Sequence, residues 1–280
     1  TENGAFPPLG TPESLMALTE ADIQLWQAMI FQPQNACLVM TGNFSDGMEL
    51  AAIEALSELR NTTALPPFTQ SLPIGFCMRD EQSDLLEEVE SDFASVQLAF
   101  DVDSEQVYPV AAEVLSTITA GNDDSMLFQA LREEQALVAE IESQISRVGQ
   151  FSRLVIRYDV RSEWLKDTLN KVFAYLHRLT MYVRPARLNQ LRTQFTTNNA
   201  MLTDDTAALN DRLGWAWMSG DTAQADLDAA AAQYNELTAE ELLDAAQTVF
   251  RPENLSIAVQ YDPEAVGDLR PLLQKLRETL

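Results

Sequence analysis

The chain contains a stretch in which apolar and polar or small positions alternate with a period of two. Val96, Leu98, Phe100 and Val102 are apolar, and the residues between them are polar or small. Successive side chains of a strand point to opposite faces, so this pattern predicts a strand that is buried on one face. Two further strands with the same period are predicted at residues 139–145 and 154–160.

Other stretches carry their apolar residues at helical spacing. A first predicted helix covers residues 107–118. A second, at 126–134, follows the loop GNDDS at residues 121–125, which offers helix-capping residues. Strands of period two beside grouped helices indicate an α+β protein, with a mainly antiparallel sheet and helices packed on one face. Four more predicted helices cover residues 163–180, 184–202, 205–218 and 223–235.

The chain contains an internal repeat. Residues 18–43 read LTEADIQLWQAMIFQPQNACLVMTGN, and residues 237–262 read LTAEELLDAAQTVFRPENLSIAVQYD. Subtracting 18 from 237 gives an offset of 219, which Leu-Thr and Phe-x-Pro-x-Asn share without a gap. Threonine followed by acids predicts a helix start, and proline predicts its end. The expected following strands lie at residues 38–40 and 255–259, and the expected closing helices at 48–59 and 264–279.

An offset near 219 is too long for a solenoid repeat and matches the size of a domain. We therefore predict two tandem copies of one domain, of which the first survives only as its last part. Residues 61–75, NTTALPPFTQSLPIG, contain three prolines and indicate a connection between the copies. The predicted division is a remnant at 1–60, a linker at 61–85 and a complete, non-catalytic domain at 86–280.

Composition narrows the choice of partners and location. The net charge is −25, from 43 acidic and 18 basic residues, and such a surface repels nucleic acid and favours basic peptides. No apolar run is long enough to cross a membrane, and the first residues lack the features of a signal peptide. The two cysteines, Cys37 and Cys77, make no disulfide framework. We expect a reduced protein in the cytoplasm.

Candidate catalytic and metal-binding residues are scarce. His177 is the only histidine, and a zinc site needs three or four nitrogen, sulfur or oxygen ligands. The sequence holds no nucleophile elbow, no phosphate-binding glycine loop and no dinucleotide fingerprint. We predict that this chain alone has no catalytic residue, no metal ligand and no cofactor, and that it is inactive by itself.

Two stretches resemble the insulinase (pitrilysin) family of zinc metallopeptidases. Residues 10–43, from GTPESLMALTEADI to LVMTGN, resemble the family's Leu-Thr helix with its Tyr/Phe-x-Pro-x-Asn and Gly-Asn signature. Residues 121–143, GNDDSMLFQALREEQALVAEIES, resemble its Ser-x-Leu-Phe-x-x-Leu-Arg stretch. The resemblance implies two homologous α+β domains that enclose a chamber. The first binds zinc through His-x-x-Glu-His and a downstream Glu, and the second closes over the peptide substrate.

The resemblance assigns one substrate-binding position to this chain. The family has an arginine and, seven residues later, a tyrosine that together grip the substrate and polarise its carbonyl. Arg132 matches the arginine, but Ala139 stands at the tyrosine position and Val138 at the preceding glycine. Loss of such a donor can cost ~10²–10³ in rate. The alternative for Arg132 is a solvated arginine beside Glu133 and Glu134.

These observations support three hypotheses. The first is the non-catalytic part of an insulinase-type peptidase, which grips peptide while zinc lies in the absent N-terminal domain or in a catalytic partner subunit. The second is a structural or assembly subunit of the same fold, which the departures at Val138 and Ala139 favour. The third is an acidic surface that captures basic peptides.

Overall fold

The computed structural model describes residues 10–33, 36–57, 84–148, 151–219 and 226–280. Asn35 of the repeat, Cys77 and most of the predicted linker lie outside these described residues. The chain forms two compact units, which are described separately. The first comprises Thr1–Ile74 with Thr197–Ala230, and the second comprises Gly75–Thr196 with Ala231–Leu280. The predicted division into residues 1–60, 61–85 and 86–280 does not group residues 197–230 with the N-terminal part of the chain. That division stays a prediction.

The second unit is built on a five-stranded sheet with the strand order β1-β5-β2-β4-β3. β1 is parallel to β5, and every other neighbouring pair is antiparallel. The prediction of a mainly antiparallel sheet is therefore confirmed, although β1 was not predicted. The strands are β1 (Asp84–Glu88), β2 (Phe93–Val102), β3 (Val138–Val148), β4 (Phe151–Arg161) and β5 (Leu255–Tyr261).

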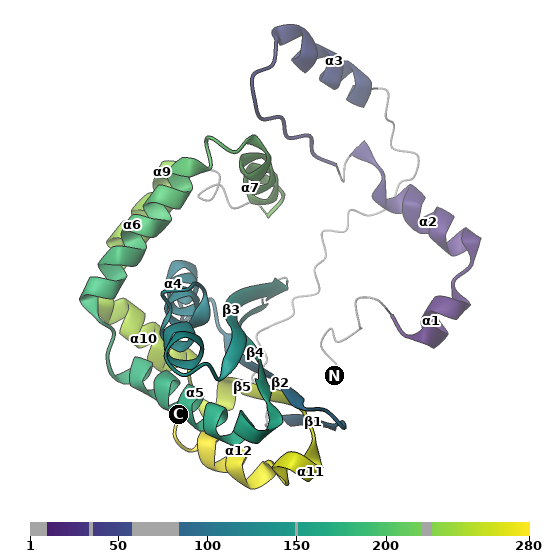
Figure 1. The fold of residues 1–280 in the computed structure, drawn as a ribbon. Coiled ribbons are helices and arrows are strands. Elements are labelled where there is room, and N and C mark those ends of the chain that lie inside the picture. The colour runs from purple at the N-terminus through teal and green to yellow at the C-terminus, as the bar shows by residue number, and fades with distance from the viewer. Residues whose placement is uncertain (1–9, 34–35, 58–83, 149–150, 220–225) are drawn as a thin grey trace. The chain divides into compact units, whose positions relative to one another are not determined.

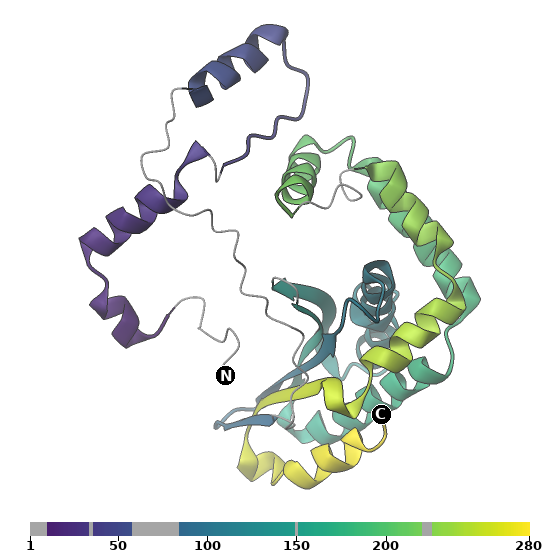
Figure 2. The ribbon, with the colours of Figure 1, turned by 180° about the vertical axis from the view of Figure 1, so that it is seen from behind.

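Helices cover one face of this sheet, as the sequence predicts. α4, α5 and α10 lie on the same side of the strands (Figure 1), and the view from behind shows the same arrangement (Figure 2). Leu98 lies opposite Ile156 on one side and Ile257 on the other, and all three are fully buried against the helices. The elements of this layer are α4 (Pro109–Ala120), the π-helix η2 (Phe128–Glu133), the short η3 (Ser162–Trp164), α5 (Leu165–Met181), α10 (Ala239–Val249), η4 (Pro252–Asn254), α11 (Pro263–Val266) and α12 (Arg270–Arg277).

The described part of the first unit is helical. Two helices, α6 and α9, start in one unit and end in the other. The predicted helix at 48–59 is observed as α3, and those at 184–202, 205–218 and 223–235 are observed as α6, α7 and α9. The bounds are α1 (Pro12–Ala17), α2 (Glu20–Ile30), α3 (Asp46–Ser57), α6 (Pro185–Met201), α7 (Thr206–Ser219) and α9 (Leu227–Glu236).

The two copies of the repeat have the same local geometry. Thr19 caps α2 and Thr238 caps α10, each in a capping box with an acid three residues later. Phe31 ends α2 with φ −81° and ψ 64°, and Phe250 ends α10 with φ −82° and ψ 67°. The turn that follows carries matching backbone bonds, from Ala36 to Pro33 and from Leu255 to Pro252. These matches support the predicted duplication.

The prediction of a strand at residues 38–40 was wrong. β5, its counterpart, pairs with β1 and β2, but residues 38–40 have no neighbouring strand among the described residues. They bond to α7 instead: Asn210 Nδ2 donates to the Val39 carbonyl over 2.9 Å, and Thr41 Oγ1 donates to the Thr206 carbonyl over 2.7 Å. A strand needs a neighbouring strand to satisfy its backbone hydrogen-bonding groups. Here hydrogen bonds with α7 take the place of such a neighbour.

Two further expectations need correction. The single closing helix at 264–279 is two helices, because Gly267 has φ 76° and interrupts α11 before α12 begins. The predicted alternation over residues 139–145 places Ala139 on one face of the strand with Ile141, Ser143 and Ile145, but in the structure Ala139 does not share that face. The register of β3 shifts between Val138 and Ile141, and this bulge leaves Ala139 exposed.

Candidate functional site

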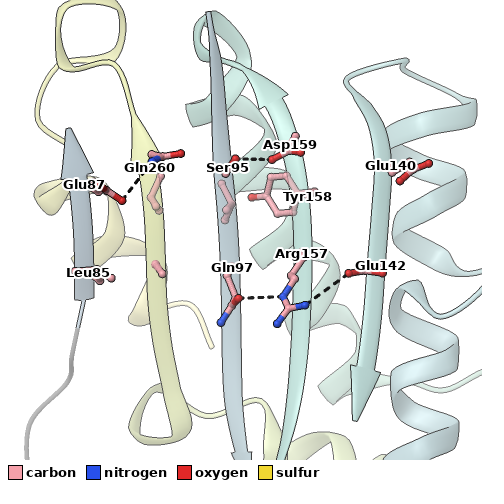
Figure 3. Close-up of a pocket in the computed structure, with 13 residues that line it drawn as sticks. Leu85, Glu87, Ser95, Gln97, Glu140, Glu142, Arg157, Tyr158, Asp159 and Gln260 are labelled. Atoms are coloured by element: carbon pink, nitrogen blue, oxygen red, sulfur yellow. Dashed lines mark hydrogen bonds and ion pairs between the residues drawn. The ribbon is translucent and has the colours of Figure 1, made fainter. Parts of the chain in front are cut away.

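The face of the sheet opposite the helices is open and polar, and it holds a hollow of about 420 Å³. Figure 3 shows this hollow from the open side, with side chains from all five strands around it. On each strand that contributes two charged or polar side chains to the lining, these side chains come from alternate residues, as the pleat requires. The charged and polar lining side chains are Glu87, Ser95, Gln97, Glu140, Glu142, Arg157, Asp159 and Gln260.

Cross-strand pairs hold most of these side chains in place. Ser95 lies directly opposite Asp159 in the register and donates to its carboxylate over 2.6 Å. Gln97 lies opposite Arg157, whose Nε donates to the Gln97 Oε1 over 3.0 Å (Figure 3). The same guanidinium is 3.9 Å from the carboxylate of Glu142 on β3. The hollow is therefore lined by a preformed network that joins three strands.

The lining is acidic. Glu87, Glu140, Glu142 and Asp159 contribute four carboxylates, and Arg157 is the one basic side chain in the lining. Glu140 has no hydrogen bond or ion pair with any described residue, and Figure 3 shows its carboxylate apart from the bonded pairs. Such a surface attracts cationic groups, and salt weakens the attraction.

Tyr158 also borders the hollow, but its side chain belongs to the core. Its hydroxyl is buried and has no hydrogen-bond partner among the described residues. Burial raises the pKa of this hydroxyl, so it stays protonated in neutral solution. Tyr158 is therefore a neutral group beneath the acidic face.

The predicted substrate-binding residue Arg132 lies on η2, outside the residues that line the hollow. Its guanidinium carbon is 4.8 Å from the centre of the Phe128 ring, and its Nε is 3.9 Å from the Glu133 carboxylate. Its side chain is exposed, so it is accessible to a ligand. Its role in substrate binding stays a prediction, as does the solvated alternative.

Ala139 lies at the bulge of β3, next to Glu140 and opposite Asp159 in the sheet. Both Ala139 and Glu140 are exposed, because the bulge places them between the buried Val138 and Ile141. A tyrosine at position 139 would therefore be exposed beside the acidic hollow. The sequence pattern missed the bulge, since a strict alternation assigns Ala139 to the core.

The side chains that could bind a metal are dispersed. No three His, Cys, Asp or Glu side chains in the described parts of the chain are grouped to bind a metal ion. His177 is exposed on α5, and Cys37 is half-buried in the first unit. These residues do not fit a zinc site. Among the helices that the structure describes, none is long and apolar enough to cross a bilayer.

The first unit exposes an apolar face on α2. Ile23, Ile30 and Phe31 are all exposed on this helix and its cap, and α2 has no buried residue. Their counterparts in the repeat are Leu242, Val249 and Phe250, which are fully buried in the core of the second unit. The same helical face therefore covers a core in one copy and is uncovered in the other.

Comparison with known proteins identifies the family. A sequence model described as "Peptidase M16 inactive domain" matches residues 17–195. This chain belongs to that family. The match covers more than half of the chain, including the first repeat motif, η2 and the β3–β4 hairpin. The resemblance to the insulinase (pitrilysin) peptidases is therefore confirmed, and the chain is an inactive M16 domain.

Solved structures share the fold of this M16 chain. A protease from Helicobacter pylori superposes with a TM-score of 0.77 at 15% identity, covering 91% of this chain and 61% of that one. A peptidase M16 inactive domain from Pseudomonas fluorescens gives 0.72 at 18% identity, covering 90% and 60%. A chain of complex III2 from Candida albicans gives 0.70 at 16% identity, covering 98% and 66%. A search of curated proteins found no match.

Proposed function

We propose that this chain is the non-catalytic half of an M16 peptidase, and that its open sheet face grips a peptide substrate. Zinc chemistry then belongs to a catalytic domain or partner subunit outside these residues. The observation that carries the proposal is the open, polar face of a sheet whose other face is fully covered by helices. The chain spans about 61% of the Helicobacter protease that it resembles, which leaves room for a further domain.

The acidic lining suggests the class of peptide. Glu140 and Glu142 on β3, with Asp159 on β4 and Glu87 on β1, place four negative charges around one hollow. A peptide with lysine or arginine side chains would gain attraction from all four carboxylates. Arg132, in the turn of helix before β3 and outside the hollow, would hold the peptide backbone or an acidic group of the peptide.

The exposed face of α2 suggests the second partner. Its counterpart α10 covers a sheet in the second unit, through Leu242, Val249 and Phe250. By the repeat, α2 covers the sheet of an equivalent domain, which in this family is the one that binds zinc. Exposed apolar patches of this kind mark sites of association.

Peptide binding is tested with a fluorescent basic peptide and two charge-reversal variants. Glu142→Lys removes an acidic charge from the hollow and should weaken binding about tenfold, since each opposite charge near a ligand contributes on the order of 1 kcal/mol. Glu105→Lys makes the same charge change away from the hollow and is the control. Equal effects of the two variants would show that only net charge matters and would refute a site on the sheet.

Inactivity of the isolated chain has its own test. The pure chain is incubated with zinc and a peptide library, and we expect no cleavage. Cleavage that a chelator abolishes would contradict the proposal.

The alternative is a structural or assembly subunit, and the likeness to a chain of Candida complex III2 favours it. Ala139 at the tyrosine position supports it too, because alanine offers no hydrogen-bond donor to a substrate. The two functions differ in whether the gene that encodes this chain also encodes a zinc-binding domain. A His-x-x-Glu-His motif there favours the peptidase, and its absence favours a scaffold or the silent partner of a heterodimer.

A further inference from the structure

A second cavity lies among the helices of the second unit, away from the open sheet face. It has a volume of about 430 Å³, within the usual range of small-ligand sites. α4, η2, α5 and the segment that leads into α6 all contribute to it. The apolar part of its walls includes Ile118, Met126, Ala130, Tyr175, Leu179 and Val183.

Three arginines line this cavity in a protein with a net charge of −25. The guanidinium of Arg178 stacks over the Tyr175 ring at 4.8 Å and donates to the Met126 sulfur over 3.4 Å. Neither Arg178 nor Arg184 pairs with a carboxylate among the described residues. Two cationic groups at this cavity are therefore not engaged in an ion pair with any described residue.

The third arginine, Arg187, is largely buried, with 17% of its side chain exposed. It donates to Asn122 Oδ1 over 3.1 Å and to Gln190 Oε1 over 2.9 Å, and its only carboxylate neighbour in the described structure is Asp124 at 3.9 Å. Desolvation lowers the pKa of Arg187, and Asp124 offsets this effect in part. A buried cation with such a distant partner gains from an additional anion.

Ser125 supplies an independent observation at the same cavity. Its residue is fully buried and lines the cavity, and its Oγ has no hydrogen-bond partner among the described residues. A buried hydroxyl without a partner costs free energy, so an acceptor or donor from a ligand would stabilise it. The hydroxyl and the three guanidinium groups lie around one cavity, and all of them can donate hydrogen bonds to an anion.

We propose that this cavity binds a carboxylate carried on an apolar group. The three arginines, with Asp124 and Glu134 in the same lining, leave one positive charge, which one carboxylate balances. The planar guanidinium of arginine matches a carboxylate with two parallel hydrogen bonds. Ser125 donates its hydroxyl to the same anion, and the apolar walls hold the attached chain. The site lies on the helical layer, so it does not depend on peptide binding by the sheet.

Calorimetric titration of the whole chain tests this proposal with octanoate and with a short peptide that ends in leucine. Octanol and the same peptide with an amidated end lack the carboxylate and are the matched ligands. We expect octanoate to bind at least tenfold more tightly than octanol. Tighter binding of the free peptide than of its amide would extend the site to peptide termini, whereas binding of octanoate alone would restrict it to small carboxylates.

Variants decide whether the cavity is the binding site. Arg178→Gln with Arg184→Gln should lower the affinity for octanoate at least tenfold, and both side chains are exposed, so the fold should be retained. Arg270→Gln, with an exposed arginine on α12, is the control and should change the affinity less than twofold. Ser125→Ala should weaken binding about threefold. The proposal would be overturned if neither carboxylate bound, or if octanol bound as tightly as octanoate. It would also be overturned if inorganic phosphate bound more tightly than octanoate, or if the double variant kept its affinity for octanoate.

Discussion

Phe31 and Phe250 end their helices with nearly the same backbone dihedral angles, yet 80% of Phe31 is exposed and only 1% of Phe250. The two residues occupy equivalent places in a repeat with an offset of 219 (250 less 31). The local sequence therefore determines how the helix ends in both copies. Burial depends on the presence of a sheet, which only the second copy has among the described residues.

This relationship predicts very unequal effects on stability for the same substitution at the two positions. Phe250 packs edge-on against Phe100, with ring centres 5.0 Å apart, so Phe250→Ala should lower the free energy of unfolding by about 3–5 kcal/mol. Phe31→Ala removes an exposed ring and should change the free energy of unfolding by less than about 0.5 kcal/mol. Urea denaturation measures both. Similar losses for the two variants would show that Phe31 is buried in solution.

The exposed face of α2 should matter for assembly and not for the stability of the chain alone. Ile23→Glu introduces a charge at a position whose counterpart, Leu242, is buried. We expect this variant to fold normally and to lose at least tenfold in affinity for a catalytic domain, because a buried unpaired charge is costly. Analytical ultracentrifugation with the separately produced zinc domain measures the affinity, and Glu20→Lys on the same helix is the control. Unchanged association would exclude this face as the contact.

Arg277 anchors the edge strand β1. Its side chain is 4% exposed, bonds to Asp84 and donates to the Leu255 carbonyl over 2.8 Å. Arg277→Met leaves this carbonyl and Asp84 without their partner, so unfolding should become easier by about 3 kcal/mol. Arg270→Met breaks an exposed pair with Asp268 and should cost less than about 0.5 kcal/mol. Hydrogen exchange of the β1 amides should accelerate in the first variant only. If the β1 amides were equally protected from exchange in the two variants, Arg277 would have no anchoring role.

The sequence predicted those elements that depend on short-range signals. Capping threonines, apolar periodicity and Phe-x-Pro-x-Asn located α2, α10, β2, β4 and β5. The strand at residues 38–40 could not be excluded, because its local pattern matches that of β5. Whether such a segment becomes a strand depends on a neighbouring strand, which is a tertiary property. β1 was missed because its residues, Asp84–Glu88, include three acids and gain stability from Arg277 at the far end of the chain.

The candidate sites were harder to predict from the sequence than the fold. Arg132 was found only through a family motif, and the structure leaves it outside the acidic hollow. The hollow itself joins residues from strands that lie as far apart as Glu87 and Gln260 in the chain. No local spacing brings these residues together, because strand order depends on packing. A bulge at Ala139 likewise follows from register and not from alternation.

The capping boxes predict a pH dependence of helix ends. Hydrogen bonds from the Thr238 backbone and side chain lower the pKa of Glu241 below its ordinary 4.5. Because the pKa of Glu241 is lowered in the folded state, its carboxylate stabilises α10 at pH values above the ordinary pKa. This contribution disappears as the pH falls through the lowered pKa. Carbon-13 NMR titration should show this low pKa, and Thr238→Val should return it toward 4.5. A pKa unchanged by this variant would contradict the role of Thr238.

The last prediction concerns Arg132 and distinguishes its two interpretations. If it grips substrate, Arg132→Gln should lower the affinity for a bound peptide about tenfold, because a charge-assisted hydrogen bond to a peptide contributes about 1.5–3 kcal/mol. The fold should lose less than about 1 kcal/mol, which is the usual contribution of an exposed cation–π contact such as that with Phe128. Lys166→Gln, on α5, makes the same charge change and should leave the affinity within twofold. Fluorescence anisotropy measures both, and an affinity unchanged by Arg132→Gln would leave this residue as a solvated arginine beside Glu133.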